Sequence, residues 1–205
     1  MTAPSSARAH RRQAPRLAAF STLALVAACA GNGPPYALTN ITGLVSPLQF
    51  HLTNQDGQAV TAGNYRHDLV LLYFGYTDCP DQCPTTLTLL ADAIHTLGPR
   101  ASRVRVLFVS VDPKRDTTSV LKRYVSNFGP EFVGLRGDQA QLTTLSKRYR
   151  IAYHYEQPDK YGNYEVDHSS AVFIFDGDGR ARLLAQSDNT EQQVASDLHR
   201  LLASS

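Results

Sequence analysis

The stretch LVLLYFGYTDCPDQCP, residues 69–84, decides the fold. Its first half, Leu69–Tyr76, is an almost unbroken apolar run, which is typical of a strand covered on both faces. Its second half carries two cysteines and ends at Pro84, and the residues that follow have a helical pattern that stops at Gly98 and Pro99. The sequence therefore predicts a buried strand, a short loop with both thiols, and a helix.

Strands and helices alternate on either side of this unit. Upstream, the alternating residues Leu48–Thr53 and the turn residues after them predict a short hairpin. Downstream, the sequence predicts a second buried strand (Val104–Val111), helices that start at Asp116 or Thr117, at Asp138 and at Thr190, and a closing hairpin of Ala171–Asp176 and Ala181–Ala185. This order predicts an α/β fold, a thioredoxin-like sandwich with a central mixed sheet, flanking helices and an N-terminal hairpin.

The N-terminal segment has the composition of a secretory signal. Four arginines and no acidic residue precede the apolar run Leu17–Ala28, whose 12 residues are fewer than the ~20 that span a bilayer. Val26-Ala27-Ala28-Cys29 resembles the lipobox of bacterial lipoproteins, in which the cysteine is lipidated. Residues 1–28 are predicted to be a lipoprotein signal peptide and Cys29 the lipidation site. An uncleaved anchor, or an ordinary signal with Cys29 as a bystander, is the alternative, and each of these places the folded part outside the cytoplasm.

Cleavage would change both the charge and the cysteine count. The 205-residue chain has a net charge of +2 and three cysteines, and removal of residues 1–28 takes away four arginines and leaves a net charge of −2. So small a charge does not indicate nucleic-acid binding. Residues 29–43 are rich in Gly, Pro and Asn and are predicted to be a tether, and residues 44–205 a single domain on the periplasmic side.

The two thiols of that domain, Cys79 and Cys83, are four residues apart, about one helical turn, so they can face the same way. Three interpretations are open at this point. A structural disulfide is common in secreted domains, although so small a loop stabilises little. A reversible redox pair agrees with the position between strand and helix. A metal site agrees with two soft thiolates. Cu(I) accepts few ligands and fits this pair more easily than Zn(II), because a closed zinc site normally needs four ligands.

The surroundings of Cys83 act on its thiol in opposite directions. The helix N-terminus favours the thiolate and lowers its pKa. Asp78 and Asp81 oppose ionisation through like-charge repulsion. The sequence therefore leaves the direction of the net pKa shift open.

A metal site needs a third ligand, and His168 is the candidate. It precedes the buried strand Ala171–Asp176, and in a thioredoxin-like fold the loop into that strand packs against the cysteine loop. His154 stays undecided. The other histidines of the domain lie on predicted helices or in early strands and turns, where ordinary solvation explains them: His51, His67, His95 and His199.

Three short blocks occur in the order YTDCPDQCP (76–84), VDPKRDT (111–117) and VDHS (166–169). Together they resemble the SCO/SenC family of copper chaperones, and the resemblance covers about residues 44–200. It implies a thioredoxin-like fold. It also implies that one copper ion, Cu(I) or Cu(II), is bound by Cys79, Cys83 and His168.

The resemblance further implies a role, because SCO/SenC proteins supply copper, or thiol reduction, to the binuclear copper site of cytochrome c oxidase subunit II. We therefore expect a membrane-anchored copper chaperone whose partner is subunit II or another extracytoplasmic cuproprotein. The alternative is a thiol–disulfide oxidoreductase that cycles Cys79 and Cys83 and keeps the target's copper-ligand cysteines reduced. Asp78 departs from the family pattern, in which many members have histidine, and is expected to lie beside the ligands rather than among them.

Overall fold

The structure is a computed structural model that describes residues 1–2 and 35–204. All but the first two residues of the predicted signal peptide lie outside the described residues, and so does Cys29. A compact unit begins at Pro35, ahead of the predicted boundary at residue 44, because part of the predicted tether packs on the domain. Leu38 is buried and its N–H donates a hydrogen bond to Asp197. Within the described residues, no helix is long and apolar enough to cross a membrane.

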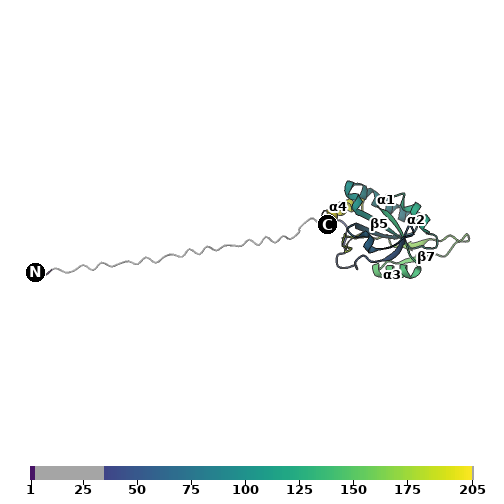
Figure 1. Cartoon of the computed structure of the whole chain (residues 1–205), viewed down its shortest axis with the longest axis horizontal. Coiled ribbons are helices and arrows are strands. Elements are labelled where there is room, and N and C mark those ends of the chain that lie inside the picture. The colour runs from purple at the N-terminus through teal and green to yellow at the C-terminus, as the bar shows by residue number, and fades with distance from the viewer. Residues whose placement is uncertain (3–34, 205) are drawn as a thin grey trace. The chain divides into compact units, whose positions relative to one another are not determined.

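A mixed sheet forms the centre of this unit (Figure 1). Its eight strands have the order β1-β10-β9-β4-β5-β6-β2-β3. Its three parallel strands are β4 (Leu69–Gly75), β5 (Val104–Ser110) and β6 (Phe132–Arg136). The antiparallel strands are β1 (Thr39–Asn40), β2 (His51–Asn54), β3 (Ala59–Thr61), β9 (Val172–Phe175) and β10 (Ala181–Ala185). A separate two-stranded sheet consists of β7 (Tyr153–Tyr155) and β8 (Val166–His168).

Helices cover both faces of the large sheet (Figure 1). α1 (Gln82–His95), α2 (Thr118–Val125) and α4 (Glu191–Ala203) pack on one face, and α3 (Gln139–Tyr149) packs on the other. Two 3-10 helices, η1 (Ala62–Tyr65) and η2 (Gly98–Arg103), precede β4 and β5. The predicted α/β sandwich is confirmed.

Strand β4 belongs to both hydrophobic cores, because successive residues of a strand point to opposite faces. Leu69, Leu71 and Tyr73 pack with residues of α1, α2 and α4. Val70, Leu72 and Phe74 pack with residues of α3. This double burial explains the unbroken apolar run, and it makes the carboxyl end of β4 a rigid base for the loop that follows.

Residues predicted to cap helices lie at the N-termini of α2, α3 and α4. Asp138 and Thr190 form capping boxes at the starts of α3 and α4, and the Thr117 side chain caps α2. Helix α1 starts at Gln82, two residues before Pro84, so that Cys83 lies within its first turn.

Candidate metal centre

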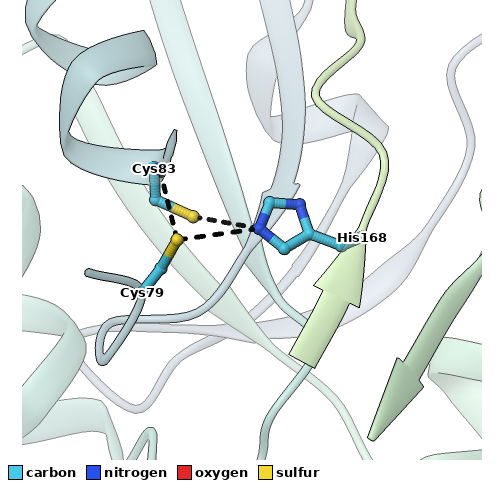
Figure 2. Close-up of side chains that lie close together, drawn as sticks. All are labelled: Cys79, Cys83 and His168. Carbon is cyan, nitrogen blue, oxygen red and sulfur yellow. Dashed lines mark hydrogen bonds between the residues drawn. The ribbon is translucent and has the colours of Figure 1, made fainter. Parts of the chain in front are cut away.

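Two distant parts of the chain place three potential ligands together. Cys79 lies half-buried in the loop after β4, Cys83 is buried in the first turn of α1, and His168 is the last residue of β8. Figure 2 shows the three side chains pointing toward one another. His168 Nε2 lies 3.3 Å from Cys83 Sγ and 4.0 Å from Cys79 Sγ. All three ligand atoms lie within 4.8 Å of one another, a spacing that one metal ion can bridge.

The imidazole of His168 is held in the form that binds a metal. Its Nδ1 lies 3.0 Å from the carbonyl oxygen of Ser169, which can only accept, so Nδ1 carries the proton and Nε2 keeps its lone pair. Burial lowers the pKa of His168, which keeps the ring neutral. The rings of Tyr73 and Tyr76 meet the imidazole edge-on, with centroids 6.1 and 5.8 Å away. The nitrogen that faces the two sulfurs is therefore available as a ligand.

Burial decides the protonation state of Cys83. Its side chain is 0% exposed, and desolvation raises the pKa of the thiol to about 12, although a backbone hydrogen bond from Tyr76 lowers it. Without metal, Cys83 is a protonated thiol at neutral pH, and metal binding must release that proton. Burial is the largest of the effects that act on this thiol.

Cys79 is the accessible member of the pair. The backbone N–H of Cys83 points at Cys79 Sγ, 3.4 Å away, so the first turn of α1 donates to the neighbouring sulfur. Both cysteines are free thiols in the structure. The pair thus consists of one half-buried cysteine and one fully buried cysteine.

Asp116 ties the cysteine loop to the end of β5. Its carboxylate accepts hydrogen bonds from the Thr77 hydroxyl (2.5 Å), the Thr77 N–H (3.1 Å) and the Ser110 hydroxyl (2.6 Å). Burial raises the pKa of Asp116, and these three bonds oppose that rise. The sequence offered Asp116 or Thr117 as the cap of α2. Thr117 is the cap, and Asp116 instead anchors the loop that carries Cys79.

We expect Asp116→Ala to lower the free energy of unfolding by about 2–4 kcal/mol, because the buried hydroxyl of Ser110 and the partly buried donors of Thr77 lose their acceptor. Urea unfolding at neutral pH measures this. Asp138→Ala, which removes an exposed helix cap, is the matched control and is expected to cost about 1 kcal/mol. A loss no larger than that of the control would show that Thr77 and Ser110 find other partners.

Arg115 connects three segments around the loop. Its guanidinium donates to the buried carboxylate of Asp112 and, through Nη1, to Asp78 at 2.7 Å, and it lies 3.8 Å from the ring centre of Tyr164. The Tyr164 hydroxyl donates to the same Asp112. Asp78 therefore lies next to Cys79 in the chain and in an ion pair with Arg115, outside the group of potential ligand atoms that converge. The positive charge of Arg115 compensates the negative charge of Asp78.

The other histidines singled out in the sequence lie elsewhere. His154 is exposed in β7 and pairs in register with Asp167 of β8, and His199 Nδ1 interacts with Arg100. Tyr73, whose hydroxyl lies 3.7 Å from Cys83 Sγ, is not among the site residues predicted from the sequence. Its position inside an apolar run gave no sign of a polar contact. The available signal was that its hydroxyl, once buried, would need a partner.

Comparison with known proteins finds a family with the same sequence pattern. The family model described as SCO1/SenC matches residues 44–203, a range that contains Cys79, Cys83 and His168. The SCO2-like protein RP587 of Rickettsia prowazekii is 37% identical over 132 residues, which are 64% of this chain and 64% of that protein. The matched region thus spans slightly less than two thirds of that relative's length.

Solved structures show the same fold. The structure described as Bradyrhizobium japonicum ScoI with copper bound has 38% identity and a TM-score of 0.68, and the match covers 77% of this chain and 98% of that chain. Yeast Sco1 with copper bound has 29% identity and a TM-score of 0.71, over 78% of this chain and 90% of that chain.

Proposed function

Because the chain belongs to the SCO1/SenC family, we propose that it is a copper-binding chaperone for the assembly of cytochrome c oxidase. In this proposal Cys79, Cys83 and His168 hold one copper ion as cargo. The observation that carries the proposal is the convergence of two sulfurs and one imidazole nitrogen within 4.8 Å. The copper-bound structures of the Bradyrhizobium japonicum and yeast relatives support the choice of metal.

The donor set suits both oxidation states of copper. Soft thiolates such as those of Cys79 and Cys83 select Cu(I). The neutral Nε2 of His168 adds the imidazole nitrogen that Cu(II) favours. A closed structural zinc site would require a fourth ligand, and the described residues bring only three together here.

The unequal exposure of the two sulfurs supports a handover in steps. The half-buried Cys79 is where a partner's cysteine or histidine first reaches the metal, while the buried Cys83 still holds it. Ligand exchange of this kind avoids release of free copper. We propose that the receiving protein is cytochrome c oxidase subunit II, with another extracytoplasmic cuproprotein as the alternative.

One observation favours a second candidate function, thiol–disulfide exchange. An accessible thiol and a buried thiol one helical turn apart resemble an attacking cysteine and its resolving partner. In this alternative the Cys79–Cys83 pair reduces the copper-ligand cysteines of the target and binds no metal itself.

The location of the protein is part of the proposal. We propose that residues 1–28 are a lipoprotein signal, that Cys29 carries the lipid, and that a tether holds the domain on the periplasmic side of a membrane. The basic start, the short apolar run and the Val26–Cys29 motif support this assignment.

Anaerobic titration of the reduced protein with Cu(I), against a coloured Cu(I) chelator, tests the proposal. We expect one copper per chain. The same protein oxidised to the Cys79–Cys83 disulfide is the control and is expected to bind no Cu(I), because both thiolates are consumed. No copper bound by a dithiol that still cycles with glutathione would favour the oxidoreductase, and failure of both activities would contradict both functions.

A further inference from the structure

The buried sulfur of Cys83 has a hydroxyl neighbour that the ligand set does not include. Tyr73 belongs to β4, six residues before Cys79. Its side chain is 0% exposed, and its hydroxyl lies 3.7 Å from Cys83 Sγ, in the range for a hydrogen bond to sulfur. The edge of its ring also contacts His168. Tyr73 therefore touches two of the three proposed ligands from one position.

The direction of this hydrogen bond follows from the chemistry of its two partners. The Tyr73 hydroxyl donates and Cys83 Sγ accepts. A thiolate that binds copper carries no hydrogen, so the phenol is the only one of the two groups that can donate in the loaded site. Because Cys83 is fully buried, water does not take the place of this donor. The remaining donor to the sulfur is a backbone N–H from Tyr76, which no side-chain substitution removes.

We propose that Tyr73 is a positioning residue of the copper centre, whose hydrogen bond to Cys83 Sγ limits how strongly this sulfur donates to the metal. Hydrogen bonds to a cysteine sulfur tune the redox behaviour of copper–thiolate sites, because they withdraw electron density from the sulfur. A weaker sulfur donor disfavours Cu(II) relative to Cu(I). Tyr73 thereby biases the site toward Cu(I). This inference rests on the proposed function, since it concerns bound copper.

The test compares Tyr73→Phe with Tyr124→Phe. Both tyrosines are buried in or against the same hydrophobic core and pack on Phe108, with ring centroids 6.1 and 5.3 Å away. Among the described residues the Tyr124 hydroxyl has no hydrogen-bond partner, so its removal breaks no hydrogen bond to the centre. The pair thus separates loss of one buried hydroxyl from loss of the bond to Cys83.

We expect Tyr73→Phe to shift the sulfur-to-Cu(II) charge-transfer absorption to longer wavelength. We also expect the ratio of Cu(I) to Cu(II) affinity to fall about three- to tenfold, where tenfold corresponds to about 59 mV for one electron. Tyr124→Phe is expected to keep the wild-type spectrum and ratio.

Two results would overturn the inference while copper binding stands. One is a Tyr73→Phe variant with the spectrum and affinity ratio of the wild type. The other is a variant that loses stability and both copper affinities equally, which would show a purely structural role. If the wild-type protein binds no copper, the proposed function fails first, and the inference with it.

Discussion

Replacement of His168 by alanine is expected to weaken Cu(II) binding by on the order of a thousandfold and Cu(I) binding by less than about tenfold. The reason is the division of labour among the ligands. Under the proposed ligand set, the thiolates of Cys79 and Cys83 satisfy Cu(I), which is stable with two soft ligands. Cu(II) needs the nitrogen of His168, whose Nε2 is kept free by the bond between Nδ1 and Ser169.

Competition titrations with separate Cu(I) and Cu(II) chelators measure both affinities. His154→Ala removes an exposed imidazole from β7, the strand paired with β8, and is the matched control, with no expected change. Cys79→Ser is the complementary variant and is expected to weaken both oxidation states. Equal losses of Cu(I) affinity and Cu(II) affinity in His168→Ala would contradict these separate roles of the thiolates and the imidazole.

The substitution Gly75→Ala is expected to weaken copper binding in both oxidation states by about a hundredfold. A Cβ atom on Gly75 would lie 2.7 Å from Cys83 Sγ and 2.8 Å from Phe108 Cε2. Both neighbours are fully buried and both contacts are too short for a real Cβ atom, so the sulfur and the ring, or the backbone of β4, must shift. Displacement of the sulfur breaks its alignment with His168, and overpacking of this kind also costs about 1–3 kcal/mol of stability.

A second glycine separates these two effects. Gly137→Ala would place a Cβ 2.6 Å from Leu52 Cδ2, in the core on the α3 side of the sheet. It is expected to lose comparable stability and to keep the wild-type copper affinity. Copper titration beside urea unfolding of both variants is the measurement. A Gly75→Ala protein with normal copper affinity would show that the backbone of β4 shifts and leaves Cys83 Sγ in place.

Local sequence signals predict most of the fold because they are strong where the elements are long. The apolar run of β4 and the caps Asp138 and Thr190 mark their elements within a residue or two. The strands that the sequence did not reveal are short. β6 has five residues interrupted by Gly134, and β7 and β8 have three each, too few for a period to show.

The residues of the candidate site also differ in how far local sequence signals predict them. The spacing of Cys79 and Cys83 shows that they can act together, because one helical turn is a local relation. His168 lies 85 residues after Cys83, so only the expected fold and the family resemblance could point to it. The roles of Tyr73 and Asp116 depend on which groups the folded chain buries beside them, and no sequence spacing encodes that.

The distance along the chain between the ligands has a consequence for folding equilibria. In an unfolded chain, Cys79 and Cys83 stay near each other, so their two thiolates can still chelate Cu(I). A ligand that also binds the unfolded state adds less stability than one that does not. Under the proposed ligand set, Cu(II) relies on His168 and hence on the assembled fold. Oxidation of the bound ion would then turn a local chelate into a cross-link that fastens β8 to the start of α1.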